Sequence, residues 1–340
     1  MFKDILKKTV EGETLTETEA KQAMDLIMNG EATPSQISSL VTVFRFRGET
    51  IEEMTGFVRS MREHAVTFDH DMEVVDTCGT GGDASSTFNI STATAIVLSG
   101  LGVKVAKHGN RGMSSKSGSA EVLDYLGIPT QSSAEHALES LEQKNMCFLF
   151  AQQYHASMKY AAPTRKEIGF RNIFNLLGPL TNPANSKRQL IGVFDTAHAE
   201  KMAKTLQNLG TERALIVTGG EGLDELSVTT HTDIVTLDGG KITRSQLVPE
   251  DVGLKRGKLA DIQVNSVQES AEMISAVLSG EGSEAATNIV LLNAGAGLYA
   301  AGRVEAIAEG VHEVSQAIRS GQIYEHLQSL REERKVESHA

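Results

Sequence analysis

The sequence has few cysteines, and the two that it has are not spaced like metal ligands. Cys78 and Cys147 lie far apart, each in an apolar or strand-like segment. We interpret both as reduced thiols in the core of a cytoplasmic protein. The alternative, that Cys78 is a nucleophile, lacks support because no local motif would activate its thiol.

Positive charge and long apolar runs are also scarce. The 32 Lys and Arg residues are outnumbered by 44 Asp and Glu, which gives a net charge of −12. This balance disfavours a broad surface for nucleic acid or anionic membrane, so an anionic ligand must be held by a local site. No apolar run reaches the ~20 residues of a membrane span, and the N-terminus does not resemble a signal peptide. The sequence predicts a cytoplasmic protein.

One segment lacks acidic residues altogether. Residues 84–120 contain no Asp or Glu but carry Lys104, Lys107, Arg111 and Lys116. The densest part, KHGNRGMSSKSGS (107–119), combines basic groups with glycines and serines after the strand-like VKVAKH (103–108). Such a run is ordinarily a solvated loop. The alternative is a loop that binds an anion.

The first part of the chain shows only helical periodicity. One predicted helix starts near Thr16 and stops at Gly30, a second follows Pro34 and ends at Gly48, and a third starts at Ile51. From Val74 onwards, short apolar runs alternate with helical stretches, which is typical of a parallel sheet covered by helices. The sequence therefore predicts an α/β fold with a small helical domain (1–70), a larger domain with a mainly parallel sheet flanked by helices (71–330), and a frayed tail (331–340).

A glycine-rich loop, GTGGD, lies between the first predicted strand and a predicted helix. This arrangement offers an anion several backbone N–H groups and the positive end of a helix dipole. The loop is not a Walker A motif because no lysine follows its glycines, and a nicotinamide-binding GxGxxA loop would need an acidic residue about 20 positions further on. A plain structural turn is the remaining alternative. Together with the loop at 107–119, GTGGD predicts one polyphosphate site at the edge of the sheet.

Two further segments carry candidate functional residues. Asp224 and Glu225 follow the strand-like RALIVTG (213–219). Adjacent carboxylates are usually surface residues, but beside a polyphosphate site they suit Mg²⁺. Arg165 and Arg171 lie in PTRKEIGFRNIFNLLGPLTNPA (163–184). This segment is interpreted either as a helix with an unfavourable basic start or as an anchor for an acidic substrate.

These segments, with FNIST (88–92), AEVLDYLG (120–127) and NLLGPLTNP (175–183), resemble the anthranilate phosphoribosyltransferases of tryptophan biosynthesis over nearly the whole chain. The resemblance implies a homodimer that uses Mg²⁺ and transfers the phosphoribosyl group of phosphoribosyl pyrophosphate (PRPP) to the amine of anthranilate, with release of pyrophosphate. No dedicated general base is implied. Lys107 would stabilise the departing pyrophosphate, and His108 is a second candidate for an electrostatic role.

The resemblance also implies the residues of each site. Those that would bind PRPP are Gly79, Gly82, Asp83, Thr87, Asn89, Ile90, Ser91, Thr92, Lys107, His108, Gly109, Asn110, Arg111, Gly112, Met113, Ser114, Ser115 and Ser119. Those that would contact or surround anthranilate are Gly79, Asn110, Arg165, His108, His155, Tyr160, Gly178 and Pro179. Those that would hold Mg²⁺ are Ser91, Asp224 and Glu225.

The chain departs from many members of this family at two positions, where Ala156 replaces proline after His155 and Ala84 replaces glycine. The first departure puts the fine positioning of the acceptor in question. Three rival functions remain open at this level. A pyrimidine-nucleoside phosphorylase has a similar fold and KHG loop, a non-catalytic relative would bind nucleic acid, and an oxidoreductase would use the GxGxxA match.

Overall fold

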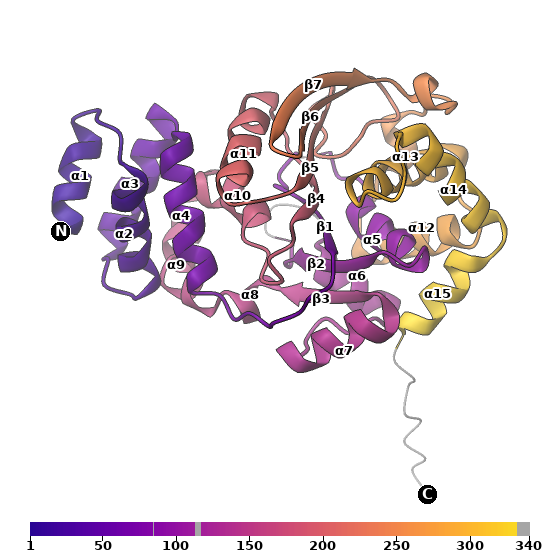
Figure 1. Ribbon diagram of the computed structural model, residues 1–340, viewed down its shortest axis with the longest axis horizontal. Coiled ribbons are helices and arrows are strands. Elements are labelled where there is room, and N and C mark those ends of the chain that lie inside the picture. The colour runs from indigo at the N-terminus through magenta and orange to yellow at the C-terminus, as the bar shows by residue number, and fades with distance from the viewer. Residues whose placement is uncertain (84, 113–116, 332–340) are drawn as a thin grey trace, which may run out of the picture.

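The computed structural model describes residues 1–83, 85–112 and 117–331. The predicted frayed tail therefore lies outside the described residues, apart from Arg331. Four helices form the N-terminal bundle: α1 (Phe2–Val10), α2 (Glu17–Met28), α3 (Pro34–Arg47) and α4 (Ile51–Glu63). Figure 1 shows this bundle at one end of an elongated molecule, with the sheet in the middle and the C-terminal helices at the other end.

The helix boundaries predicted for the bundle are confirmed, and their cause is local. Thr16 caps α2 by accepting a hydrogen bond from the Glu19 backbone, while Glu19 bonds back to the Thr16 backbone. The start of α3 at Pro34 is capped in the same way by Thr33, and its end is followed by Gly48. Reciprocal caps of this kind satisfy backbone donors that the first helical turn leaves free.

A seven-stranded sheet forms the centre of the larger domain, in the order β3-β2-β1-β4-β5-β6-β7. The first five strands of the chain pair in parallel. They are β1 (Val74–Gly79), β2 (Lys104–Gly109), β3 (Met146–Phe150), β4 (Arg188–Gly192) and β5 (Arg213–Gly219). The mainly parallel sheet is therefore confirmed.

Two strands extend this sheet in the antiparallel direction and were not predicted. They are β6 (Thr232–Asp238) and β7 (Lys241–Leu247), joined by a tight turn at Gly239 and Gly240. The sequence does carry a signal for them, because Asp-Gly-Gly between two strand-like segments is typical of a hairpin.

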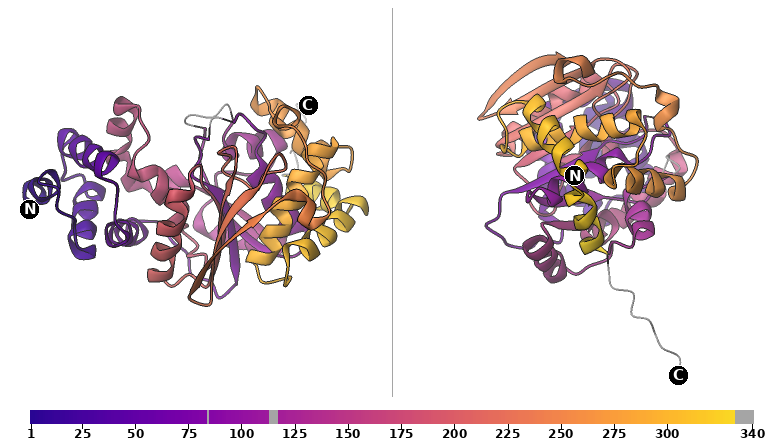
Figure 2. Two further views of the ribbon diagram at one scale, coloured as in Figure 1. Left: turned by 90° about the horizontal axis from the view of Figure 1, so that it is seen from above. Right: turned by 90° about the vertical axis from the view of Figure 1, so that its right-hand side faces the viewer.

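Helices cover both faces of the sheet. Because successive residues of a strand point to opposite faces, alternate residues belong to two different hydrophobic clusters. Leu190 and Leu215 face one cluster, whereas Ile191 and Ile216 face the other. The first cluster lies under α5 (Ile90–Gly100), α6 (Ser119–Leu126), α12 (Val267–Leu278), α13 (Glu284–Ala300), α14 (Ile307–Arg319) and α15 (Gln322–Leu330). Figure 2 shows the C-terminal helices, α12 to α15, gathered on the side of the sheet opposite the N-terminal bundle.

The second cluster joins the N-terminal bundle to the sheet. It combines apolar residues of α2, α3 and α4 with those of α10 (Ile173–Leu177) and α11 (Thr196–Asn208). Three short elements complete this side: α8 (Ala151–Tyr154), a 3₁₀ turn (Ala156–Tyr160) and α9 (Ala162–Ile168). Arg62 of α4 donates a hydrogen bond to the Leu180 carbonyl at 2.9 Å. The remaining helix, α7 (Ala134–Lys144), packs beside β3 at the sheet edge.

Candidate active site

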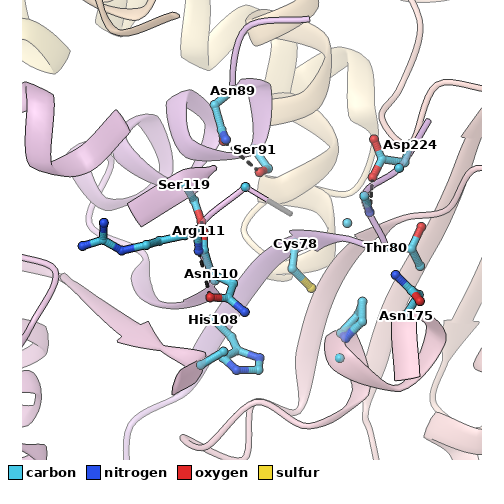
Figure 3. Close-up of a pocket in the computed structure, with 18 of the residues that line it drawn as sticks. Cys78, Thr80, Asn89, Ser91, His108, Asn110, Arg111, Ser119, Asn175 and Asp224 are labelled. Atoms are coloured by element: carbon cyan, nitrogen blue, oxygen red, sulfur yellow. Dashed lines mark hydrogen bonds between the residues drawn. The ribbon is translucent and has the colours of Figure 1, made fainter. Parts of the chain in front are cut away.

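A cavity of about 800 Å³ lies at the carboxyl ends of the parallel strands, where ligands bind in sheets of this kind. The ends of β1 and β2, the start of α5, the loop after β5 and the segment around α9 and α10 line it. Met61 from the N-terminal bundle also reaches it. The close-up in Figure 3 shows the polar side chains that converge on this space.

The GTGGD loop forms one wall of the cavity. Gly82 has φ +77°, a conformation that L side chains rarely adopt. A Cβ at Gly82 would stand 2.7 Å from Nε of Arg171, which in turn lies over the ring of Phe194. Gly81 donates its backbone N–H to Oδ2 of Asp224 at 2.8 Å. The loop is thus bound to the segment that carries the paired carboxylates. Ala84 lies outside the described residues.

The start of α5 faces the same space. Asn89 caps this 11-residue helix, and its Oδ1 accepts hydrogen bonds from the Thr92 backbone at 3.2 Å and the Thr92 hydroxyl at 2.6 Å. Asn89, Ile90 and Ser91 line the cavity. Thr92 does not, because its side chain is fully buried against its own cap. Thr92 supports the start of α5 through Asn89, and its implied role in PRPP binding stays a prediction.

The loop after β2 forms the opposite wall. Gly109, Asn110, Arg111, Gly112 and Ser119 line the cavity. Glu121 holds the two ends of the loop together, since its Oε2 accepts the backbone N–H of Gly112 at 2.9 Å and of Gly118 at 2.8 Å. Met113, Ser114 and Ser115 lie outside the described residues. The two Gly/Ser loops predicted to meet at one sheet edge therefore do so.

The paired carboxylates lie between these walls. Burial raises the pKa of Asp224 to about 6, and the nearby Asp83 contributes to the rise. Burial and repulsion from Asp224 raise the pKa of Glu225 well above its usual range. Glu225 also accepts a hydrogen bond from the backbone of Ser91. The three predicted metal-binding residues are thus adjacent, and the carboxylates of Asp224 and Glu225 repel each other unless a cation is bound.

This set of oxygen atoms fits Mg²⁺. Hard carboxylate and hydroxyl oxygens are its preferred protein ligands, and it keeps its other positions for water and substrate oxygens. Within the part of the chain that the structure describes, no group of three or more His, Cys, Asp and Glu side chains forms a complete metal cage. Water and substrate oxygens would supply the remaining ligands.

Lys107 lines the cavity, although most of its side chain is buried beneath it. Its side chain is only 1 % exposed, and Nζ donates hydrogen bonds to the Thr77 carbonyl at 2.6 Å and to the Ser91 hydroxyl at 3.1 Å. Burial lowers the pKa of this ammonium group, although Asp76 and Glu225 act in the opposite direction. The ammonium group of Lys107 thus lies at the cavity bound to Thr77 and Ser91, and its direct contact with phosphate stays a prediction.

Two histidines face the cavity in neutral form. The ring centroids of His108 and His155 are 5.1 Å apart. Burial lowers the pKa of His108 to about 3 and that of His155 to about 4. Nε2 of His155 contacts the Thr181 carbonyl at 3.0 Å. Both rings therefore remain uncharged at neutral pH.

Three of the predicted acceptor residues line the same cavity. Arg165 lines it together with Gly178 and Pro179. The guanidinium lies 5.1 Å from the ring centroid of Phe174, and burial lowers its pKa to about 10. Arg165 belongs to the last turn of α9, so the interpretation of this segment as a helix with a basic start is wrong. A cation in the last turn is favourable for the helix dipole.

Tyr160 is not brought to this site. Its side chain packs on Gly30 of the N-terminal bundle and against Lys159, and Tyr160 is absent from the described residues that line the cavity. The implied contact of Tyr160 with anthranilate is therefore not supported. Ala156, in contrast, lines the cavity together with His155, so this departure from the family pattern faces the cavity.

Several lining residues were missed by sequence reasoning. Gln152 and Asn175 supply polar groups, and Phe174 supplies an aromatic ring. Their signal was weak because they lie on short helices without a motif of their own. Cys78 is a buried core residue as predicted, and it also reaches the cavity wall. Burial raises the pKa of its thiol well above the usual range, which disfavours a nucleophilic thiolate.

Comparison with known proteins agrees with this arrangement. Residues 3–65 match the helical bundle domain of a glycosyl transferase family, and residues 71–324 match the α/β domain of that family. The anthranilate phosphoribosyltransferase of Halalkalibacterium halodurans is 58% identical over 342 residues, covering 100% of both chains. The chain therefore belongs to the anthranilate phosphoribosyltransferases within that glycosyl transferase family.

Solved structures show the same fold. The anthranilate phosphoribosyltransferase of Thermus thermophilus superposes with a TM-score of 0.89 at 39% identity, covering 96% of this chain and 97% of that chain. That of Saccharomyces cerevisiae, in complex with PRPP and Mg, gives a TM-score of 0.88 at 25% identity, covering 97% and 96%. In the described residues, no helix is long and apolar enough to cross a membrane.

Proposed function

We propose that the cavity is the site at which this chain transfers the phosphoribosyl group of PRPP to the amine of anthranilate. One observation carries the proposal. Two Gly/Ser loops and the start of α5 converge on the same cavity as the carboxylates of Asp224 and Glu225, and Arg165 also lines it. The loops and the start of α5 thus suit a polyphosphate, and Arg165 suits a carboxylic acid bound in the same cavity.

The two loops bind the phosphates of PRPP. Backbone N–H groups of the GTGGD loop and the positive end of α5 attract the anionic groups. Ser91, Asp224 and Glu225 would hold Mg²⁺, which would neutralise negative charge on the pyrophosphate. Lys107 adds positive charge beneath Ser91 and keeps the hydroxyl of Ser91 oriented.

Arg165 binds the carboxylate of anthranilate and so places the amine for reaction. A guanidinium forms two parallel hydrogen bonds with a carboxylate, which fixes the direction of approach. The amine attacks C1 of the ribose, and the bond from C1 to pyrophosphate breaks. Holding the two reactants in line supplies a large part of the rate enhancement.

The amine needs no dedicated base in this scheme, because it loses its proton readily once the new bond has formed. His108 and His155 are neutral at pH 7, since burial keeps the pKa of both rings low. Their role in the proposal is to shape the cavity and to provide uncharged hydrogen-bonding groups near the acceptor.

The experiment follows the fluorescence of anthranilate mixed with the protein, PRPP and Mg²⁺. We expect a fall that requires PRPP and is abolished by EDTA. A folded sample that shows no fall would contradict the proposal, and phosphorolysis of thymidine with inorganic phosphate would then test for a pyrimidine-nucleoside phosphorylase. A salt-dependent gel shift would test for nucleic-acid binding.

We also propose an assembly and a cellular location for the protein. The family resemblance supports a homodimer in the cytoplasm that acts on small molecules without nucleic-acid or membrane partners. Sedimentation equilibrium on the full chain tests the dimer, and a single species of 36.5 kDa would contradict it.

A further inference from the structure

A buried amide holds the segment that carries the paired carboxylates. Asn293 of α13 is 0 % exposed, and its Oδ1 accepts the backbone N–H of Leu226 at 2.9 Å. Its Nδ2 donates to the Leu226 carbonyl at 3.0 Å and to the Ile289 carbonyl at 2.8 Å. One side chain thus satisfies both backbone polar groups of Leu226.

Leu226 directly follows Glu225 in the chain, so the position of the Leu226 backbone constrains where the carboxylates of Asp224 and Glu225 lie. The side chain of Leu226 is itself fully buried. Removing the amide of Asn293 would leave a buried N–H and a buried carbonyl without partners, which is costly in an apolar interior. The loop would relieve this cost by shifting, and Glu225 would shift with it.

Several other hydrogen bonds lie within this loop, and one comes from outside it: Gly81 of the GTGGD loop donates its backbone N–H to Asp224. Oε1 of Glu221 accepts the hydroxyls of Ser227 and Thr229, each at 2.6 Å. These bonds maintain the internal shape of the loop. The amide of Asn293 is different, because it comes from a helix and fixes the loop relative to the core.

The same helix also supports the other half of the metal site. The backbone of α13 at Gly297 approaches Leu98 of α5 so closely that a Cβ there would stand 2.7 Å from the Leu98 side chain. The first turn of α5 carries Ser91. α13 therefore packs on α5, whose first turn carries Ser91, and also holds Leu226 beside Glu225.

We propose that Asn293 is a positioning residue for the reaction: by fixing Leu226, its amide aims Asp224 and Glu225 at the divalent cation. The inference rests on the proposed function. Asn293 does not itself contact substrate, since it is buried behind the loop. Its loss should therefore weaken Mg²⁺ binding specifically and leave the binding of anthranilate unchanged.

The test compares Asn293→Leu with a matched variant on the same helix. Asn288 is 8 % exposed, and its side-chain amide donates a hydrogen bond to the Lys255 carbonyl at 3.0 Å. Asn288→Leu therefore also removes a hydrogen bond from α13 to a loop, but this loop does not carry the paired carboxylates. For each variant, the thermal unfolding midpoint is titrated with Mg²⁺ at saturating PRPP. The Mg²⁺ dependence of activity is measured in parallel.

We expect Asn293→Leu to raise the Mg²⁺ concentration for half-saturation about tenfold in both measurements, which corresponds to a modest loss of binding energy. Asn288→Leu should change it less than twofold, although both variants unfold at lower temperature. The KM for anthranilate should stay within twofold in both. Equal shifts in Mg²⁺ half-saturation for the two variants would overturn the inference.

A second variant keeps the test decisive if Asn293→Leu does not fold. Asn293→Asp retains an acceptor for the Leu226 N–H, so a smaller rise in Mg²⁺ half-saturation, about threefold, is expected. An unchanged value would overturn the role of Asn293. A wild-type protein without PRPP- and Mg²⁺-dependent loss of anthranilate fluorescence would instead contradict the proposed function, which separates the two failures.

Discussion

The backbone of Gly192, the last residue of β4, lies directly against the backbone of Asp224. A Cβ at Gly192 would stand 1.5 Å from the Asp224 carbonyl oxygen. At the end of β1, a Cβ at Gly79 would stand 2.5 Å from Oδ2 of the same aspartate. The absence of side chains at two strand ends therefore creates the space that the carboxylate segment occupies.

Gly192→Ala should displace this segment, because a methyl group cannot share space with a backbone carbonyl. We expect a loss of about 1–3 kcal/mol in the free energy of unfolding, as for other overpacked sites, together with a strong loss of Mg²⁺-dependent activity. Urea unfolding measures the first effect. Gly178→Ala is the control for stability, since open space surrounds that position. Equal unfolding free energies for the two variants would contradict the steric argument.

Arg165→Ala should raise the KM for anthranilate at least about tenfold, the equivalent of one charge-assisted hydrogen bond, and affect the KM for PRPP much less. The reason is the place of Arg165 in the cavity wall, where its Nε has no hydrogen-bond partner. Steady-state kinetics with each substrate varied measures both constants. The neighbouring Lys166 is exposed, so Lys166→Ala serves as control. Proportional changes in both KM values would rule out selective binding of the acceptor.

Asp224→Asn should weaken Mg²⁺-dependent activity while leaving the fold intact. Without metal, the same change should raise the thermal unfolding midpoint by about 2 °C or more at pH 8. The raised pKa of Asp224, about 6, means that its charged form is disfavoured in the folded state. Its ordinary pKa is 3.8.

The sign of this effect fixes its pH range. Above pH 6 the carboxyl is charged in both the folded and the unfolded protein. The wild-type fold then bears the full free-energy cost of the buried charge, so Asp224→Asn gains the most stability. The gain should decline as the pH falls through 6 and vanish only below the ordinary pKa of 3.8, where both states are protonated. Thermal scans in EDTA across this range measure it. A gain that persists unchanged at pH 4 would show that charge is not the cause.

Tyr160→Ala should leave the KM for anthranilate within about twofold of the wild-type value, as expected for a surface substitution away from a functional site. The ring is 41 % exposed and packs on Gly30 rather than facing the cavity. Kinetics under the conditions used for Arg165→Ala measure the constant. A rise comparable with that of Arg165→Ala would place Tyr160 at the acceptor site after all.

Much of the site was predictable because its signals are local in the chain. Glycine conformations, helix caps and the change from helical to strand periodicity depend on a few neighbouring residues. GTGGD, the start of α5 and the basic loop could therefore be placed at strand ends. Parallel pairing then brings all such ends to one edge.

The sequence by itself thus determined the helical bundle, the parallel strands and the loops that meet at the cavity. Only the tertiary structure decided which way side chains point and what lies behind them. Lys107 is buried beneath Ser91, and Tyr160 faces the bundle. Asn293 meets Leu226 across 67 positions of sequence. Such contacts depend on how whole helices pack on the sheet, and no local pattern of residues encodes them.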